Sequence, residues 1–353
     1  MFVEPGMAEV VLQKVYSAGP SLPQDRAGRL GTPAGTRPGG GPGVCTTTIV
    51  RTLDLMQTRH FLQLIALSAL WGASFPLIRI AAPALGPVGL AGIRCLLAAA
   101  VLALLMRALR QRWPPRAAWK RLTLLGCLTV LMPFLMFNWA GLVIPAGYSA
   151  VLNATAPLFG ILGAAAIGEE RLTARRLAGC ALGFLGVALL VQLGPVAVDT
   201  RVVLAALACI AAAASYGLGA ILMKRAAMAH QPLPASAAVH VAAAALLLLP
   251  GAATVPSMQF TPGALIAAGI LGSFTSGFMY WVSMRLMREI SASAATSAAF
   301  MIPLFGVTWG GLFLGEPVTA GMLPGCLLIL TATALVTGFN PFRRAAPAAL
   351  PLR

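Results

Sequence analysis

The sequence predicts an all-α integral membrane protein with ten transmembrane helices, arranged as two inverted-topology repeats of five helices. Composition is the first observation behind this prediction. Of the 353 residues, 59% are hydrophobic and only 10% are charged, which is unlike a soluble globular protein. The second observation is that charge is almost absent from stretches about as long as a bilayer is thick. The third is an internal repeat.

The repeat is clearest at the tetrapeptide Pro-Leu-Phe-Gly, which occupies residues 157–160 and returns at residues 303–306. Of the 26 aligned positions that begin at these tetrapeptides, 11 are identical. That is more than chance gives in a chain so rich in Ala, Leu and Gly. Each copy is followed by a glutamate, Glu170 in the first and Glu316 in the second. The chain therefore contains a duplicated unit.

Residues 1–57 differ from everything that follows. Ser21 to Gly43 is rich in Gly, Pro, Thr and Arg without apolar periodicity, so we expect a disordered extension. It lacks an apolar run followed by a small-residue cleavage site, and we expect no signal peptide. Met56 directly precedes the first apolar segment, which makes it an alternative start of translation.

Ten apolar segments follow, separated by short turns that often contain Pro or Gly. In chain order they cover about residues 61–80, 86–106, 119–141, 146–167, 174–193, 201–223, 236–253, 261–284, 291–314 and 320–338. The first five form the first repeat, residues 58–196, and the last five form the second repeat, residues 197–340. Residues 341–353 form a tail.

The charges of the connecting loops predict the orientation. If the N-terminus is cytoplasmic, almost all basic residues near the segment ends face the same side: Arg107, Arg110, Arg112, Arg116, Lys120, Arg121, Arg171, Arg175, Arg176, Lys224, Arg225, Arg285, Arg288, Arg343, Arg344 and Arg353. The opposite loops hold one basic residue, Arg201. Cytoplasmic loops of membrane proteins carry such an excess. We therefore expect a bacterial inner-membrane protein with both termini cytoplasmic, and the net charge of +16 does not indicate nucleic acid.

An odd number of segments per repeat gives the second repeat the opposite orientation to the first. Glu170 then lies on the cytoplasmic side and Glu316 on the outer side. Inverted-topology repeats are typical of secondary transporters, because two halves of opposite orientation can exchange inward-open and outward-open shapes around a central site.

Several short motifs, in this order and duplicated in this way, make the sequence similar to the EamA-type branch of the drug/metabolite transporter superfamily. They are Trp71-Gly72-Ala73-Ser74-Phe75, Arg94, Pro157 with Glu170-Arg171-Leu172-Thr173, and Pro303 with Gly315-Glu316-Pro317-Val318-Thr319. The resemblance covers about residues 58–340. The sequence departs from the family at Glu169, where Gly is usual, and at Pro317, where Arg is usual.

The resemblance implies a secondary transporter that exports or exchanges small metabolites, such as amino acids or related compounds, without an ATP site or cofactor. A pore or a non-transporting membrane scaffold is the alternative. An enzyme is not expected, because the sequence has no His-Glu-x-x-His, no Gly-x-Ser-x-Gly and no intramembrane Asp pair. The six cysteines and three histidines have no metal-ligand spacing. The expected partners are the bilayer and a small-molecule substrate. Whether the protein forms a homodimer stays open.

Pro157 and Pro303 are hinge candidates because each lies about halfway along its segment. A proline inside a helix removes a hydrogen bond and leaves backbone acceptors free at membrane depth. Two symmetric broken helices would supply both a hinge and substrate-facing carbonyls. The alternative is a kink that only shapes packing.

The candidates for a substrate cavity are Trp71, Phe75, Arg94, Ser149, Asn153, Tyr216 and Tyr280. Ser149 and Asn153 share one helical face, and the buried amide of Asn153 needs a partner in protein or in a wet cavity. The tyrosine hydroxyls also need partners, and the rings of Trp71 and Phe75 could stack on a substrate.

Arg94 lies about 10 Å into the second segment at 1.5 Å per residue. A buried arginine costs about 2.5–3.5 kcal/mol at a helix centre, and no segment contains an Asp or Glu to compensate it. Carbonyls, water or an anionic substrate group must do so. A substrate or gating role and anchoring to helix-end carbonyls both remain open.

Proton-coupled carriers commonly relay protons through Asp, Glu or His within their helices. Here the candidates are the repeat-end carboxylates Glu170 and Glu316, with His240 near the start of the seventh segment. Either coupling uses these groups, or the protein is an exchanger or uniporter. Glu170 has a simpler alternative, which is pairing with Arg171, Arg175 or Arg176.

Overall fold

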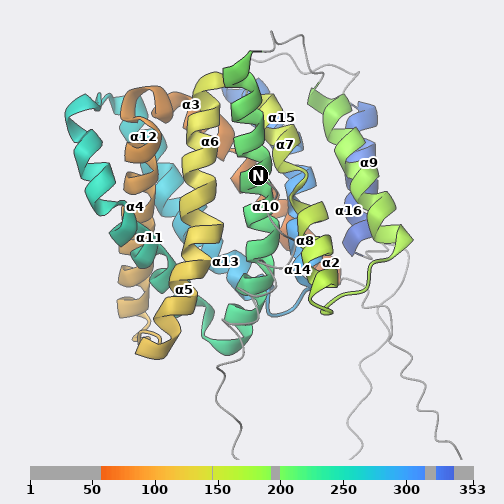
Figure 1. The fold of residues 1–353 in the computed structure, drawn as a ribbon, viewed down its shortest axis with the longest axis horizontal. Helices are drawn as coiled ribbons and strands as arrows, with labels where there is room; N and C mark the ends of the chain where they lie inside the picture. The colour runs from red at the N-terminus through yellow and green to blue at the C-terminus, as the bar shows by residue number, and fades with distance from the viewer. Residues whose placement is uncertain (1–56, 145, 192–198, 315–322, 338–353) are drawn as a thin grey trace, which may run out of the picture. The chain divides into compact units, whose positions relative to one another are not determined.

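The structure is a computed structural model that describes residues 57–144, 146–191, 199–314 and 323–337. These residues belong to one compact unit. Every regular element in the described residues is a helix (Figure 1), which confirms the all-α prediction there. Glu316, Met56 and the tail lie outside the described residues.

The first repeat begins at α2 and ends at α9. Its elements are α2 (Thr58–Gly72), α3 (Ser74–Leu85), α4 (Pro87–Ala108), η1 (Arg116–Ala118), α5 (Trp119–Gly126), η2 (Cys127–Leu131), α6 (Met132–Val143), α7 (Ala146–Asn153), α8 (Ala156–Ala166) and α9 (Ala174–Val191).

The second repeat begins at α10 and ends at α16. Its elements are α10 (Thr200–Ala229), α11 (Pro232–Thr254), η3 (Val255–Ser257), α12 (Pro262–Ile270), η4 (Leu271–Phe278), α13 (Met279–Leu286), α14 (Ala292–Thr296), α15 (Ala298–Leu314) and α16 (Leu323–Thr337).

Six helical stretches of the described residues are long and apolar enough to cross a membrane. They are Thr58–Leu85, Pro87–Ala108, Arg116–Val143, Thr200–Ala229, Pro232–Ser257 and Pro262–Leu286. The four other expected segments contain α7 with α8, α9, α14 with α15, and α16. Helical residues thus occur in every expected segment, while ten membrane crossings stay a prediction.

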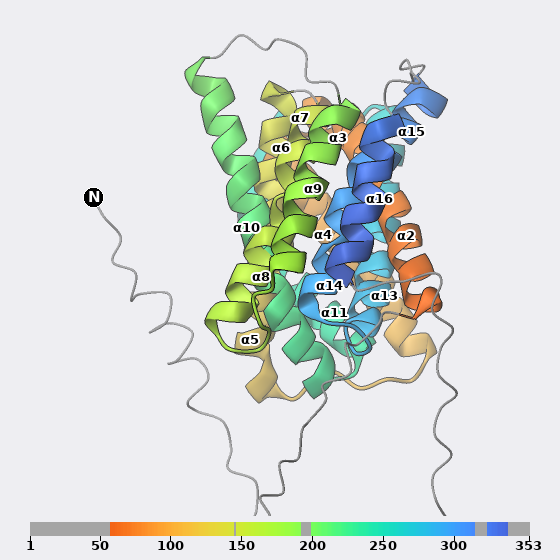
Figure 2. The same ribbon diagram turned by 90° about the vertical axis from the view of Figure 1, so that its right-hand side faces the viewer.

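Helix packing follows the sequence repeat, because most major contacts have a counterpart in which the two repeats are exchanged. α4 packs against its equivalent α11, and α9 packs against its equivalent α16 (Figures 1 and 2). The contact between α2 and α15 has its counterpart between α10 and α8. For whole segments, the first packs against the eighth, as α3 with α12, and the sixth packs against the third, as α10 with α6. The architecture therefore fits two related halves.

The connections carrying the basic residues lie together at one end of the helices. These are the segments between α4 and η1, α8 and α9, α10 and α11, and α13 and α14 (Figures 1 and 2). The connections between α3 and α4, α6 and α7, and η3 and α12 lie at the opposite end. We call the first end the basic end.

Both repeats contain a π-helical turn at the same place, which the sequence analysis did not predict. η2 follows α5, and η4 follows α12. A π-turn inserts an extra residue into the helical ladder and is frequent at functional sites. Thr129 belongs to η2, and Thr275 and Ser276 belong to η4. All three side chains line a cavity in the interior.

The repeated Pro-Leu-Phe-Gly packs against a repeated glycine. A Cβ atom on Gly217 of α10 would lie 2.6 Å from the carbonyl oxygen of Ala156 and 2.7 Å from the nitrogen of Gly160. In the equivalent contact, a Cβ atom on Gly72 of α2 would lie 2.9 Å from the carbonyl oxygen of Ile302. Small residues at such helix contacts let two backbones approach closely. We call these two contacts the glycine seams.

We expect Gly217→Ala to lower the unfolding free energy by about 1–3 kcal/mol, because the new methyl group meets backbone atoms that cannot move aside. Gly269→Ala is the matched control, since nothing lies within 4 Å of a Cβ at this helical position. Thermal unfolding of both variants in detergent checks the prediction. Equal melting temperatures for the two variants would contradict the tight seam.

Candidate substrate cavity

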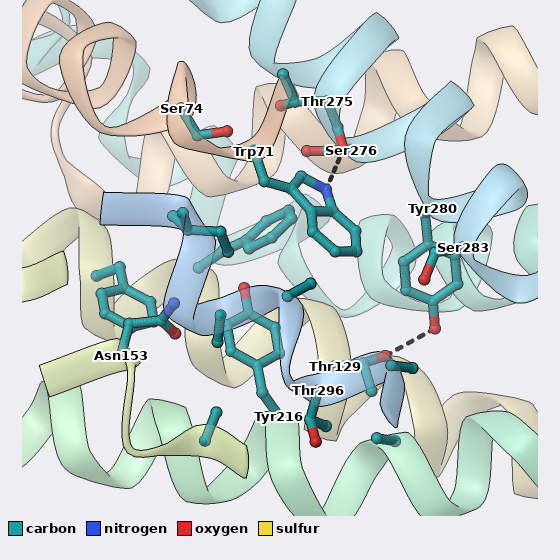
Figure 3. A pocket seen from close by; sticks show the side chains of 18 of the residues that line it. Trp71, Ser74, Thr129, Asn153, Tyr216, Thr275, Ser276, Tyr280, Ser283 and Thr296 are labelled. Carbon is teal, nitrogen blue, oxygen red and sulfur yellow. Dashed lines mark hydrogen bonds between the residues drawn. The ribbon is translucent and has the colours of Figure 1, made fainter. Parts of the chain in front are cut away.

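A cavity of about 180 Å³ lies between helices of both repeats. Figure 3 shows side chains from several helices converging on it. The polar and aromatic residues in its wall are Trp71, Ser74, Phe75, Arg94, Thr129, Phe134, Phe137, Asn153, Tyr216, Thr275, Ser276, Tyr280, Ser283 and Thr296. Six of the seven cavity candidates from the sequence therefore lie in one wall.

Ser149 is the candidate that does not line the cavity. It lies one turn before Asn153 on α7 and is buried, and its hydroxyl accepts a hydrogen bond from the thiol of Cys209 at 3.8 Å. Ser149 shares a helical face with Asn153, but its side chain packs against α10 and does not reach the cavity.

Arg94 enters the wall from α4 and is 5% exposed. Its Nε and Nη2 donate to the hydroxyl of Ser276 at 3.4 and 3.2 Å, and Nη1 donates to Oδ1 of Asn138 at 3.4 Å. The guanidinium also stacks on the ring of Phe134, 3.7 Å from its centroid. None of the ion pairs among the described residues includes Arg94.

A backbone contact orients Asn138, one of these partners of Arg94. Its amide Nδ2 donates to the carbonyl oxygen of Pro87 at 3.0 Å, which leaves Oδ1 facing Arg94. The sequence analysis missed both Asn138 and Ser276 as neighbours of Arg94. The signal was available for Asn138, because an amide within an apolar segment needs a buried partner as much as Asn153 does.

Asn153 is the last residue of α7, where the helix is interrupted before α8 begins at Ala156. The side chain lines the cavity (Figure 3) and is 5% exposed. Its Oδ1 has no hydrogen-bond partner among the described residues. Because an unpaired buried acceptor costs about 1–3 kcal/mol, this oxygen is ready to accept a hydrogen bond from a ligand.

Aromatic rings cover much of the remaining wall. The indole of Trp71 donates to the carbonyl oxygen of Thr275 at 3.2 Å (Figure 3). Phe75 packs edge-on against Phe137, whose ring stacks on Tyr216, with 6.1 Å between the centroids in each pair. These contacts hold the rings in place before any ligand enters.

Tyr280 closes another part of the wall. Its hydroxyl is 2.8 Å from that of Thr129 on the π-turn η2 (Figure 3). Its ring packs edge-on against His240, with 4.8 Å between the centroids. His240 is buried behind Tyr280 and does not line the cavity; its Nδ1 bonds the carbonyl of Ser236.

The two hinge candidates occupy different places. Pro157 is the second residue of α8, directly after the interruption of the fourth segment. The ninth segment is interrupted at Ser297, between α14 and α15, so that Pro303 lies inside α15. Residues beside both interruptions line the cavity. Whether either proline is a hinge stays a prediction.

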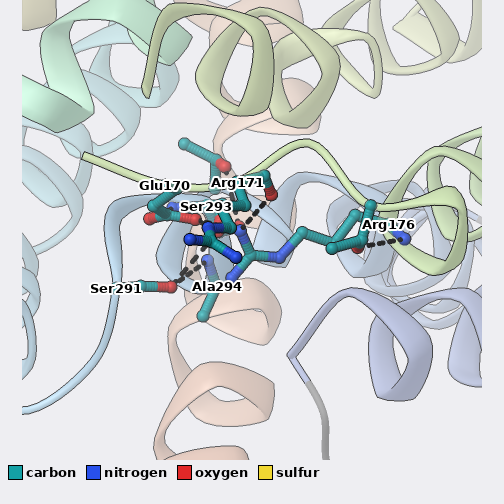
Figure 4. Close-up of polar contacts among 8 residues, drawn as sticks. Glu170, Arg171, Arg176, Ser291, Ser293 and Ala294 are labelled. Atoms are coloured by element: carbon teal, nitrogen blue, oxygen red, sulfur yellow. Dashed lines mark hydrogen bonds and ion pairs between the residues drawn. The ribbon is translucent and has the colours of Figure 1, made fainter. Parts of the chain in front are cut away.

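Glu170 lies at the basic end and binds two partners (Figure 4). Its Oε2 is 2.6 Å from Nη1 of Arg176, one of the three arginines considered from the sequence. The hydroxyl of Ser293 donates to the same oxygen at 2.5 Å, and the backbone N–H of Ser293 donates to Oε1 at 3.4 Å. Glu170 thereby joins the connection after α8 to the first turn of α14.

Further polar contacts lie at this end. Within the second repeat, Lys224 donates to the carbonyl oxygen of Ile290 at 2.7 Å. Between the repeats, Glu169 pairs with Arg225 at 2.6 Å, and Glu289 pairs with both Arg59 and His60 at 2.7 Å. With the Glu170 contacts we call these the basic-end contacts. The hydrogen bond from His60, helped by the charge of Arg59, lowers the pKa of Glu289 below its ordinary value.

No group of three or more His, Cys, Asp or Glu side chains among the described residues is placed to hold a metal ion. Among the described residues that line the cavity, the polar and aromatic groups are the guanidinium of Arg94, neutral hydroxyls, the amide of Asn153 and aromatic rings.

The chain is similar to several proteins that are named as transporters. It is 28% identical over 303 residues to "Uncharacterized transporter YvbV" of Bacillus subtilis, covering 83% of this chain and 96% of that protein. It is 27% identical over 261 residues to the "Probable terminal-alkyne amino-acid exporter" of Streptantibioticus cattleyicolor, covering 73% and 86%. It is 26% identical over 291 residues to the "Probable amino-acid metabolite efflux pump" of Salmonella typhimurium, covering 78% and 94%.

A solved crystal structure has the same fold, with a TM-score of 0.68 at 19% identity, covering 80% of this chain and 99% of that one. The model of the EamA-like transporter family matches residues 59–192 and 203–338. These two stretches lie within the two repeats that the sequence predicts, and together they make up most of the chain. The chain belongs to the EamA-like transporter family and is a multi-pass membrane transporter.

Proposed function

We propose that the protein is a secondary transporter that exports or exchanges small metabolites, amino acids or related compounds, across the bacterial inner membrane by alternating access. The observation that carries the proposal is a cavity whose wall is drawn from both repeats and lies beside both helix interruptions. In inverted-repeat carriers the binding site lies at the repeat interface and is formed by such discontinuous helices.

The proposal includes ten membrane crossings with both termini cytoplasmic. Helical residues in every expected segment support the count. The gathering of the basic connections at one end supports the orientation (Figure 1), because cytoplasmic loops carry the excess of Lys and Arg. The names of the relatives as exporters and efflux pumps support outward transport.

The basic-end contacts are the proposed closed gate. Glu169 and Glu170 of the first repeat bind residues of α10 and α14 in the second, and Glu289 of the second repeat binds residues of α2 in the first. Opening the cavity to the cytoplasm requires these contacts to break. The pairs of Arg59 with Glu289 and of Arg225 with Glu169 are partly exposed to solvent, where an ion pair is individually weak enough to exchange with water.

Among the described residues that line the cavity there is no Asp, Glu or His. A proton relay through the site would need such a group. Exchange or uniport therefore fits the cavity better than proton coupling.

A carrier and a pore differ in how flux depends on concentration. We expect proteoliposomes containing the purified protein to take up radiolabelled substrate in a saturable way. Uptake should accelerate when unlabelled substrate is present inside the vesicles. The probes are a panel of labelled amino acids and 2-hydroxy acids. Flux that rises linearly without saturation or trans-stimulation would support the pore instead.

The hinge proposal predicts that Pro157→Ala and Pro303→Ala slow transport about tenfold or more while substrate binding changes little. Alanine restores the backbone N–H that proline lacks. The segment can then form the missing helical hydrogen bond, which makes it stiffer. Pro250→Ala is the matched control, because Pro250 also lies inside a helix but is exposed on α11. Counterflow rates and binding constants are measured for all three variants. Full transport rates in the Pro157→Ala and Pro303→Ala variants would contradict the proposal that these prolines act as hinges.

The contact between Glu289 and His60 predicts a pH dependence of stability. A carboxyl with a lowered pKa stabilises the folded state above its ordinary pKa of 4.5 and loses this contribution as the pH falls through the lowered value. Glu289→Gln should therefore melt at a lower temperature than the wild type at pH 7. This difference should shrink as the pH falls below about 4.5 and vanish below the lowered pKa of Glu289. A difference of equal size at pH 4 and pH 7 would show that the charge of Glu289 is not involved.

A further inference from the structure

We infer that the ligand of the cavity is a small monocarboxylate that also carries a neutral hydrogen-bond donor. The carboxylate would pair with Arg94, and the donor would bond Oδ1 of Asn153. This inference rests on the proposed transport function and narrows its substrate class.

Arg94 is the residue that would bind the anionic end of the ligand. The guanidinium is a permanent cation with five N–H donors, yet its described partners are one serine hydroxyl and one amide oxygen, at 3.2–3.4 Å. These neutral contacts are longer than charge-assisted hydrogen bonds, which measure about 2.7–2.9 Å. A planar carboxylate matches the guanidinium fork in both charge and geometry. The cavity thus contains a desolvated positive charge that a ligand carboxylate would neutralise.

Asn153 assigns the donor end. Its side chain lines the same cavity, and its buried Oδ1 has no partner among the described residues. A carbonyl oxygen accepts hydrogen bonds and cannot donate them. The ligand must therefore bring an O–H or N–H to this point. A purely apolar acid would leave the oxygen unpaired.

The walls and the volume set the size of the ligand. A cavity of about 180 Å³ is only slightly larger than an engineered cavity of about 150 Å³ that holds benzene. The ring of aromatic side chains, with Trp71, Phe75 and Tyr216 among them, suits a short branched or unsaturated hydrocarbon skeleton. A molecule with about four to six carbon atoms fits this space.

Net charge decides between an amino acid and its neutral-donor analogues. A zwitterion would neutralise Arg94 but would bring an ammonium group with three donors into a wall that, among the described residues, has no carboxylate. Desolvating a charged group without a counter-ion is costly. A hydroxyl or amide N–H in the same position satisfies Asn153 without that cost. The site therefore favours a 2-hydroxy or N-acyl acid over the free amino acid.

Four compounds of one carbon skeleton test the inference on the wild-type protein. They are 2-hydroxyisovalerate, isovalerate, valine and valinamide, titrated calorimetrically into the full-length protein in lipid nanodiscs. We expect 2-hydroxyisovalerate to bind most tightly, isovalerate and valine about tenfold or more weakly, and valinamide not measurably, because each lost charge-assisted or buried hydrogen bond is worth about one decade.

Two variants assign the ends of the ligand. Arg94→Met should weaken the binding of 2-hydroxyisovalerate about 10- to 100-fold. Arg94→Lys should regain part of this affinity, because lysine keeps the positive charge. If Arg94 served only in packing, lysine would not regain it. Asn153→Leu should weaken the binding of 2-hydroxyisovalerate about tenfold more than the binding of isovalerate, which has no donor for Asn153. The matched control is Arg79→Met, which removes an exposed arginine of α3 and should leave all four affinities unchanged.

Tighter binding of valine or valinamide than of 2-hydroxyisovalerate, or binding of none of the four at millimolar concentration, would overturn the inference. Saturable counterflow of cationic or neutral compounds in the proteoliposomes would leave the transporter proposal standing while this inference fails. Linear flux of every compound would instead remove the transporter proposal itself.

Discussion

The buried guanidinium of Arg94 is the constraint on which the rest of the cavity depends. Removing a cation from water is tolerated only if the protein or a ligand replaces the lost solvation. The protein supplies Ser276 from the opposite repeat, Asn138 from α6 and the ring of Phe134. These neutral groups solvate the charge but do not cancel it, which is why we propose an anionic ligand for the cavity.

The repeated Pro-Leu-Phe-Gly has a double role in the fold. Its glycine packs against the backbone of the partner helix, Gly160 against Gly217 and Gly306 near Gly72, which fixes how closely the fourth and ninth segments approach their neighbours. The proline of the first copy begins α8 directly after a helix interruption. The close backbone contact therefore lies next to a helix interruption, and residues beside that interruption line the cavity.

Much of this could be predicted from sequence, because apolar length, loop charge and an internal repeat are local or periodic signals. The same holds for cavity residues such as Arg94 and Asn153, whose polarity conflicts with their apolar surroundings. The π-turns, the break at Ser297 six residues before Pro303, and the pairing of Arg94 with Ser276 could not. They depend on tertiary contacts between residues far apart in the chain. Ser149 shows the same limit, because a shared helical face does not say which neighbour that face meets.

The most direct test of the account is an experimental structure of the protein with 2-hydroxyisovalerate bound. We expect the ligand carboxylate to lie about 2.7–3.0 Å from the guanidinium nitrogens of Arg94, with the ligand hydroxyl donating to Oδ1 of Asn153. A ligand bound outside this cavity, or one whose carboxylate faces away from an unchanged Arg94, would contradict it.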